Sequence, residues 1–76
     1  MVIDLIVINT GDGFTADVPS IKGCESWAHV EDDAIKNAVE LLRFYINLPE
    51  TQEIKIDRAR KSLNKIVYKL IFNKEL

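Results

Sequence analysis

The hydrophobic period of the chain changes once, near Glu31, and this change restricts the folds that the sequence can adopt. Before that point, apolar residues occur in a β-branched run and then at every second position, as they do in strands. After it, they recur every three or four positions as far as Leu48, as on one side of a helix. The order predicts an α+β fold in which strands precede one long helix.

Three strands are predicted before the change of period. Residues 2–8 form a run rich in Val and Ile, and residues 14–18 alternate between apolar and polar side chains. Between them, residues 10–13 hold an Asp-Gly pair, which tolerates positive φ and is typical of a hairpin turn. After a loop with proline and glycine, residues 24–28 are predicted to form a third, short strand.

A helix is predicted over residues 31–48. Its acidic first turn, Glu31, Asp32 and Asp33, suits the positive end of a helix dipole, and Pro49 ends it. Phe44 falls on the polar side, where it is either exposed or in contact with another chain. Two adjacent stripes form the apolar face: Ala34, Ala38, Leu41, Tyr45 and Leu48, and beside them Ile35, Val39, Leu42 and Ile46.

The last third of the chain is compatible with two structures. Ala59, Leu63 and Ile66 begin a helical stripe, whereas residues 66–72 have the β-branched and aromatic composition of a strand. We expect a C-terminal strand over 66–72, preceded over 49–65 by a basic connector that is partly extended or helical. An antiparallel three-stranded sheet, one helix and this strand then form a single domain over 1–76.

The size and composition of the chain exclude several classes of protein. Its 76 residues, 47% hydrophobic and 29% charged, match an ordinary globular domain. The longest apolar runs are far below the roughly 18 residues of a membrane span, and the N-terminus lacks the pattern of a signal peptide. We therefore expect a cytoplasmic location.

A chain this short has a small core, and it has no covalent or metal staple to support that core. The single Cys24 cannot form an internal disulfide, and with the single His29 it cannot complete a structural zinc site. Covering further apolar surface would help, so we expect a homodimer. The candidate contacts are Phe44 and, on an open edge at the C-terminal strand, Tyr68, Leu70 and Phe72.

Charge is unevenly spread along the chain. Residues 1–50 carry a balance of −6 and residues 51–76 a balance of +4, within a net charge of −2. This asymmetry indicates either an acidic surface for a basic partner or complementarity between the two halves. The basic residues Arg58, Arg60 and Lys61 are weak candidates for contacts with nucleic-acid phosphates, but few aromatic residues accompany them, and a solvated connector fits better.

No catalytic or metal-binding constellation stands out, and no cofactor is expected. Asp4, Asp12, Asp17 and Glu40 are too few and too scattered to predict a magnesium site. Cys24 and His29 lie five residues apart, but a thiolate and imidazole pair would need a third group to orient it. A buried thiol and a loop histidine fit the sequence better, so we expect a protein that is not an enzyme.

Short motifs in the first half of the chain resemble the HicB-like antitoxin family, without gaps over about residues 1–48. The family pattern has an aromatic and an alanine, a valine-proline, a glycine-cysteine, two acids with an alanine, and an asparagine-alanine. Where many relatives have a glycine and a capping threonine, this chain has Ala28 and Val30. The matching residues are Phe14, Ala16, Val18-Pro19, Gly23-Cys24, Asp32-Asp33-Ala34 and Asn37-Ala38.

The resemblance implies a truncated ribonuclease-H-like fold and a partner, a small basic RNA-cleaving toxin of the HicA type. Residues 51–76 are too short for the DNA-binding domain that many HicB antitoxins carry. Carboxylates would then lie where RNA phosphates bind the toxin, with Trp27 as an apolar anchor. The candidate carboxylates are Asp12, Asp17, Glu25, Glu31, Asp32 and Asp33. Two alternatives remain: a free-standing oligomeric scaffold or regulator with the same fold, or a weak nucleic-acid binder.

Overall fold

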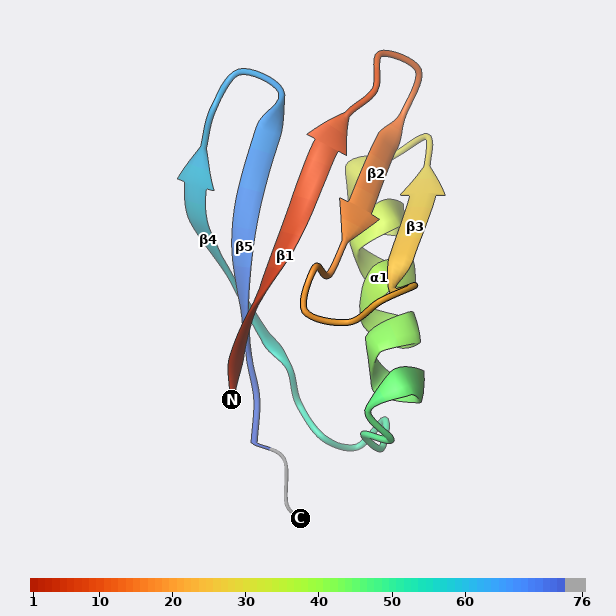
Figure 1. The fold of residues 1–76 in the computed structure, drawn as a ribbon, viewed down its shortest axis with the longest axis vertical. Helices are drawn as coiled ribbons and strands as arrows, with labels where there is room; N and C mark the ends of the chain where they lie inside the picture. The colour runs from red at the N-terminus through yellow and green to blue at the C-terminus, as the bar shows by residue number, and fades with distance from the viewer. Residues whose placement is uncertain (74–76) are drawn as a thin grey trace.

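In the computed structural model, which describes residues 1–73, a five-stranded antiparallel sheet packs against one helix (Figure 1). The order across the sheet is β3-β2-β1-β5-β4, so the first strand is central and the last strand lies beside it. The helix lies behind β2 and β3, and the β4–β5 hairpin extends beyond it. The elements are β1 (Val2–Asn9), β2 (Phe14–Asp17), β3 (Glu25–Ala28), α1 (Glu31–Tyr45), β4 (Lys55–Lys61) and β5 (Lys65–Ile71).

The three N-terminal strands and the helix form as the sequence predicts. The turn between β1 and β2 is closed by a hydrogen bond from the Thr10 amide to the Gly13 carbonyl, 2.9 Å long. Gly11 has a φ of 95°, a conformation that glycine adopts without strain. The Asn9 side chain also accepts a hydrogen bond from the Gly11 amide at 2.9 Å. The turn therefore fixes the register in which Ile8 pairs with Thr15.

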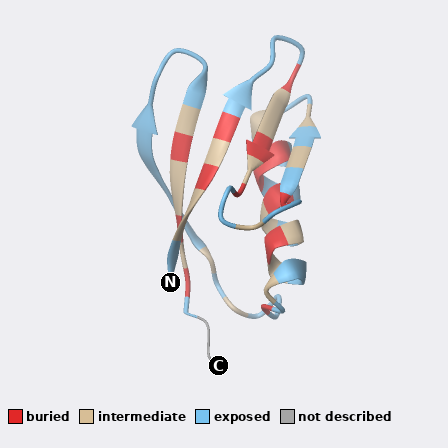
Figure 2. Cartoon of the chain, viewed as in Figure 1, coloured by how far each residue is buried: buried red, intermediate tan, exposed pale blue. Residues whose placement is uncertain are grey.

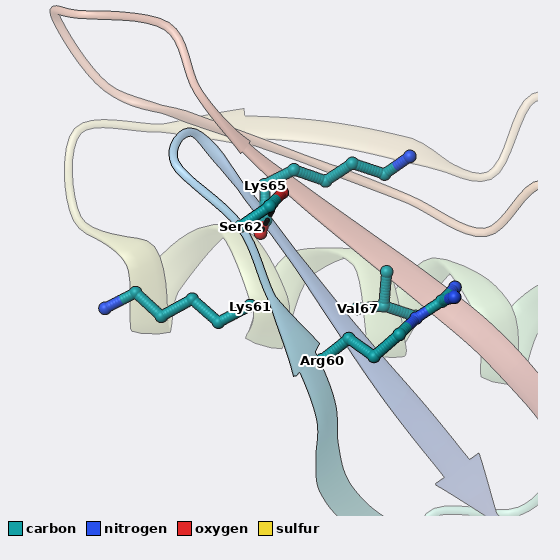
Figure 3. Close-up of a pocket in the computed structure, with 5 residues that line it drawn as sticks. All are labelled: Arg60, Lys61, Ser62, Lys65 and Val67. Carbon is teal, nitrogen blue, oxygen red and sulfur yellow. Dashed lines mark hydrogen bonds between the residues drawn. The ribbon is translucent and has the colours of Figure 1, made fainter.

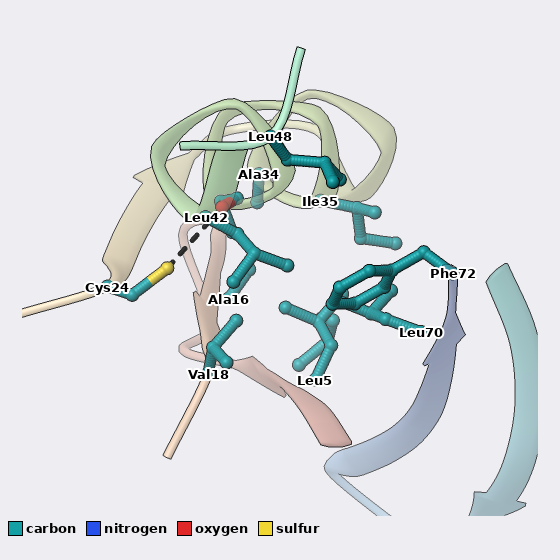
Figure 4. Packing of buried hydrophobic residues seen from close by; sticks show 12 residues of the cluster. Leu5, Ala16, Val18, Cys24, Ala34, Ile35, Leu42, Leu48, Leu70 and Phe72 are labelled. Carbon is teal, nitrogen blue, oxygen red and sulfur yellow. Dashed lines mark hydrogen bonds between the residues drawn. The ribbon is translucent and has the colours of Figure 1, made fainter. Parts of the chain in front are cut away.

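The core lies between the helix and one face of the sheet (Figures 2 and 4). Leu5, Leu42 and Leu70 are completely buried in it, and each such side chain contributes about 1.5–3 kcal/mol. Three fully buried alanines, Ala16, Ala34 and Ala38, leave room for close packing of the helix on β2 and β3. The remaining buried residues of this core are Val7, Val18, Cys24, Ile35, Leu48 and Phe72, whereas Val67 is buried on the other face of the sheet.

The helix begins at Glu31 as predicted, but it ends at Tyr45 rather than Leu48. Asn47 adopts a φ of 60° there and turns the chain, so that Leu48 still reaches the core. The Arg43 guanidinium donates hydrogen bonds to the carbonyls of Pro49 and Gln52, at 2.8 and 2.7 Å. These bonds tie the linker that leads to β4 to the last turn of the helix.

The main difference from the sequence prediction lies in the connector predicted over residues 49–65. Its second half forms strand β4, which pairs with β5 in an antiparallel hairpin. The sheet therefore has five strands, whereas the sequence predicts a three-stranded sheet and one further C-terminal strand. Every residue of β4 is exposed, and a bulge lies between Arg58 and Arg60. Because neither face of the strand is buried and the bulge breaks the alternation, the sequence carries no period-two signal there.

The predicted C-terminal strand is present as β5, one residue earlier than expected, but it is not an edge. It lies between β1 and β4, and the open edge belongs to β4. Leu70 and Phe72 are 0% and 4% exposed in the core, and Tyr68 lies on the face that α1 covers. These three candidate oligomer contacts are thus occupied within the monomer, whereas Phe44 is 76% exposed.

Within residues 1–73, no helix is both long enough and apolar enough to cross a membrane. Lys74, which contributes to the basic balance of the C-terminal half, lies outside the described residues.

Candidate functional site

The side of the sheet opposite α1 is not covered by another element of residues 1–73, and we call it the open face (Figure 1). Strand alternation defines it, because Leu5 and Val7 point toward the helix and their neighbours point away. Its side chains are those of Val2, Asp4, Ile6, Ile8, Thr15, Asp17, Glu25, Trp27, Lys55, Asp57, Arg60, Lys65, Val67, Lys69 and Ile71.

One row of side chains crosses all five strands of the open face. The register pairs Glu25 with Asp17, Asp17 with Ile6, Ile6 with Val67, and Val67 with Arg60. Two carboxylates thus stand at the β3 end of the row, two apolar side chains in the middle and a guanidinium at the β4 end. The unequal charge of the two halves of the sequence becomes a lateral separation of charge on one surface.

The next row places an exposed aromatic residue at the acidic side. Trp27 pairs with Thr15, Thr15 with Ile8, and Ile8 with Lys65. Trp27 is 45% exposed and Ile8 is 43% exposed. The open face therefore combines an aromatic anchor, an apolar centre and charges at both sides.

The indole of Trp27 is held in place by the β1–β2 turn. Its Nε1 donates a hydrogen bond of 3.3 Å to Thr10 Oγ1, and its ring meets that of His29 edge-on with centroids 4.6 Å apart. Gly13 lies beneath the ring, where an added Cβ would come within 2.4 Å of the Trp27 Cζ2 atom. The ring is thus ordered before any partner arrives, which lowers the entropic cost of using it in an interface.

Asp12 belongs to the same small network at the tip of the turn. The Thr10 hydroxyl donates to Asp12 Oδ1 at 3.0 Å, and His29 Nδ1 lies 3.1 Å from the Asp12 carbonyl oxygen. Both groups are exposed, so the carboxylate of Asp12 is available to solvent near Trp27. Asp12 therefore extends the acidic side of the open face around the turn.

The structure divides the predicted partner-binding residues into two groups. Asp17, Glu25 and Trp27 share the open face, with Asp12 at the adjoining turn. The other group, Glu31, Asp32 and Asp33, lies in the first turn of α1, in the second layer of the fold. Val30, at the helix N-cap, makes no side-chain capping bond, and the acidic residues remain as the favourable charges at this end.

Glu31 has a structural partner of its own. Its Oε1 atom accepts a hydrogen bond of 2.7 Å from the hydroxyl of Tyr68 on β5. Burial, together with this hydrogen bond and the charge of Glu31, raises the pKa of Tyr68 to about 12. Glu31 therefore links the helix to the sheet, which sets it apart from the exposed Asp32 and Asp33.

The basic residues at the opposite edge are also divided. The bulge in β4 leaves Arg60 on the open face, in register with Val67, while Arg58 and Lys61 pair with Tyr68 and Ile66 on the helix side. The side chains of the three predicted phosphate contacts therefore leave the strand on two different sides, with Arg58 away from the open face. Other charged side chains of the open face are paired with each other. Asp4 on β1 forms an ion pair with Lys69 on β5, and the exposed Lys55 lies 3.7 Å from Asp57 on β4.

Next to Arg60 the open face is hollowed. The hollow has a volume of about 450 Å³, and Arg60 and Lys65 extend on either side of Val67 (Figure 3). Ser62 and Lys61 complete its lining. An apolar floor with two cationic side chains suits an aromatic ring, which gains from both contacts.

Sequence reasoning did not find this hollow. The alternation of Lys65, Val67 and Lys69 was a signal for a strand with two cations on one face. The position of Arg60 had no such signal, because it depends on the bulge and on the pairing of β4 with β5. The basic corner of the open face therefore required the structure.

The structure separates the residues that the sequence offers as candidates for catalysis or metal binding. Cys24 is completely buried, its Sγ donates to the Ala38 carbonyl oxygen at 3.5 Å, and burial raises the pKa of its thiol. His29 is exposed at the turn network, so the two do not form a reactive pair. Asp4 and Glu40 lie on opposite sides of the sheet, and residues 1–73 contain no cluster of three His, Cys, Asp or Glu side chains able to hold a metal ion.

Some of the residues that carry the family resemblance lie in the core between β2, β3 and α1: Ala16, Val18, Cys24, Ala34 and Ala38 are all completely buried. Others are exposed, namely Pro19, Gly23, Asp32, Asp33 and Asn37. The apolar part of the pattern therefore coincides with the packing of the helix on the hairpin, and none of these residues lies on the open face. No protein-family model, curated protein or solved structure matches the chain.

Proposed function

We propose that the protein is a HicB-like antitoxin module that binds and masks a small basic RNA-cleaving toxin of the HicA type. The observation that carries the proposal is the acidic side of the open face, where Asp17, Glu25 and Trp27 lie together beside Asp12. An RNA-cleaving protein presents cations where phosphates bind. Carboxylates set around an ordered indole complement such a surface.

The fold supports the proposal at a coarser level. Three antiparallel strands followed by a helix agree with the order that the resemblance implies, and the apolar residues Ala16, Val18, Cys24, Ala34 and Ala38 of the family pattern are buried in the core. We further propose that this β1-β2-β3-α1 unit is the truncated ribonuclease-H-like core of the family. β5 is then the C-terminal strand expected with this core, and β4 is an additional strand at the edge of the sheet.

Masking would depend on two physical terms. Attraction between the carboxylates and the basic toxin speeds association and weakens with salt. The indole of Trp27, already held by Thr10, adds apolar contact at little entropic cost. Removing the charges should therefore slow association, whereas truncating Trp27 should speed dissociation.

The test is binding to the small basic protein encoded next to this chain, measured by surface plasmon resonance at two salt concentrations. The variants Asp17→Lys and Glu25→Lys should weaken binding about tenfold or more, and the wild-type affinity should fall as salt rises. Asp32→Lys and Asp33→Lys make the same charge change at exposed positions of the helix and serve as matched controls. These controls should retain most of the wild-type affinity.

Two results would contradict the proposal. Absence of binding between the wild-type chain and any small basic protein encoded beside it would remove the antitoxin function. Equal losses of affinity in the helix variants and the open-face variants would show that the toxin does not bind specifically at the acidic side of the open face. A normal circular dichroism spectrum for every variant ensures that lost binding reflects the surface and not the fold.

A free-standing oligomeric scaffold or regulator remains the second candidate, because the open face carries both signs of charge. Such a protein would keep the fold and associate with itself, without a toxin encoded nearby. The two functions differ in whether a basic partner raises the thermal stability of the chain, as binding to the folded state requires.

A further inference from the structure

The open face is complementary to itself. Asp4 on β1 and Asp57 on β4 lie beside Lys69 and Lys55, with which they form ion pairs. The charged side chains without such a partner within residues 1–73 are Asp17 and Glu25 on β2 and β3, and Arg60 and Lys65 on β4 and β5, while apolar side chains are centred on β1. A two-fold axis running along β1 would bring a second copy face to face with its strand order reversed. β3 of one copy then lies over β4 of the other, and β1 lies over β1.

This axis preserves position along the strands, so each row meets the same row of the second copy. In the row that crosses all five strands, Glu25 then faces Arg60 of the second copy and Ile6 faces Ile6. A two-fold axis across the strands would instead place β3 over β3 and oppose like charges. Along this row, charge therefore favours the axis that runs along β1, and the two Asp4 side chains that this axis also opposes are each paired with Lys69.

The same arrangement gives Trp27 a place to bind. Trp27 lies on β3, one row from Glu25, and the hollow beside Arg60, Val67 and Lys65 lies on the strands that β3 of the second copy would cover. The hollow of about 450 Å³ offers an apolar floor and two cations to the exposed face of the indole. We propose that the protein forms a two-fold dimer through the open face, with Trp27 of each copy seated in the hollow of the other.

The edges of the sheet are less suited to self-association. β4 presents Lys55, Arg58, Arg60 and Lys61 against the single acidic Asp57, and it carries a bulge. Antiparallel pairing of two such edges would oppose like charges, and basic side chains with bulges are common means of blocking edge pairing. β3 is only four residues long. The face, rather than an edge, is therefore the surface for a second copy.

This dimer does not depend on the proposed toxin, but both partners would use the acidic side of the open face. The basic side of a second copy presents to Glu25 and Trp27 the chemistry that a basic toxin would present. Self-association and toxin binding should therefore exclude each other. The experiment below contains no toxin, so its failure would leave the proposed function standing.

The test is a charge exchange, measured by sedimentation equilibrium over about 10 to 500 micromolar protein. Glu25→Arg and Arg60→Glu should each weaken the dimer about tenfold or more, because each sets like charges face to face. The double variant should restore association to near the wild-type level, since the exchanged pair is again complementary. Trp27→Ala should weaken the dimer without affecting charge.

Lys36→Glu and Glu40→Arg are matched controls on the exposed side of α1 and should leave the dimer unchanged. A wild-type chain that stays monomeric over this range would overturn the proposal. So would a double variant as weak as the single ones, since Glu25 and Arg60 would then not face each other. Equal weakening in the helix controls would place the interface on the other layer of the fold.

Discussion

Glu25 and Arg60 occupy opposite ends of one row of side chains that crosses the whole open face, with Asp17, Ile6 and Val67 between them. Four strand spacings separate the two charges, so they do not meet within one chain. Within residues 1–73, neither forms an ion pair. Asp4 and Lys69 are the charges that join the two halves of the sequence by an ion pair within residues 1–73, whereas Glu25 and Arg60 remain exposed at the two sides of the open face.

Gly13 should be the residue that keeps Trp27 in its binding position. In Gly13→Ala, the new Cβ would meet the Trp27 ring at 2.4 Å and the Ala28 carbonyl oxygen at 2.6 Å. We expect the ring to be displaced, at a cost of about 1–3 kcal/mol in unfolding free energy. Urea denaturation measures the loss, and the indole fluorescence reports the displacement, because Trp27 is the single tryptophan.

Gly11→Ala is the control within the same turn. Gly11 has a φ of 95° but open space around its Cβ position, so the variant should lose about 1 kcal/mol through backbone strain alone. Its indole emission should match that of the wild type. An equal change of emission in both variants would show that the turn as a whole, and not contact with Gly13, positions the ring.

Tyr68 should make stability depend on pH in the alkaline range. Its pKa is raised from 10.0 to about 12 in the folded chain, so below pH 10 both states hold the proton and the contribution is complete. Between pH 10 and about 12 the unfolded chain loses the proton first, and stability should fall as pH rises. Tyr68→Phe should be about 1 kcal/mol less stable at neutral pH, and it should lack this part of the decline.

The measurement is the difference in unfolding free energy between wild type and Tyr68→Phe, which cancels the titration of lysines common to both. The difference should shrink above pH 10. Tyr45→Phe removes the other tyrosine hydroxyl, which donates a longer bond of 3.4 Å to the Gly23 carbonyl oxygen, and it should keep the decline. A difference that stays constant up to pH 12 would contradict the contact between Tyr68 and Glu31.

Cys24 should be inert in the folded protein. It is completely buried against Ala38, and burial raises the pKa of the thiol, so both access and the thiolate fraction are low. At about pH 8, a disulfide reagent should modify Cys24 slowly in buffer and rapidly in urea. Rapid modification under native conditions would show that the packing of α1 on the β2–β3 hairpin opens readily.

Leu70 and Leu63 should differ sharply, although both lie in the basic C-terminal third. Leu70 is completely buried beneath α1, whereas Leu63 is 95% exposed in the β4–β5 turn. Leu70→Ala should cost about 2–5 kcal/mol, a large share of the stability of so short a chain, and Leu63→Ala should cost almost nothing. Thermal unfolding of the two variants checks this, and similar melting temperatures would contradict the placement of β5 beside β1.

The sequence predicts the elements that have one buried and one exposed face. Residues 14–18 alternate because Ala16 and Val18 are buried, and the helix is recognised because Ala34, Ala38 and Leu42 repeat on its buried side. The sequence does not predict β4, because every residue of this strand is exposed and burial therefore imposes no alternation of apolar and polar residues on it. The helix end is predicted three residues late because Leu48 keeps the helical spacing and reaches the core through the turn at Asn47.

The sequence allows the acidic side of the candidate site to be predicted, but not its basic side. Trp27 and Glu25 could be named because the chain has a single tryptophan and residues 1–50 have an excess of acidic side chains. That both lie on one face with Asp17 depends on the β2–β3 register. The basic side could not be assigned, since it joins Arg60 to Lys65 and Val67 through a strand without a sequence signal. Charge counts report how much charge a segment carries, and register decides which charges share a surface.

We propose that the acidic side of the open face binds a small basic toxin. The most direct measurement is a nitrogen–proton NMR spectrum of the labelled chain, recorded with and without the unlabelled basic protein encoded beside it. We expect the indole signal of Trp27 and the amides of Asp17 and Glu25 to shift, while those of Lys36 and Glu40 on the exposed side of α1 stay in place. Shifts confined to the helix, or a spectrum that the added protein leaves unchanged, would contradict the claim.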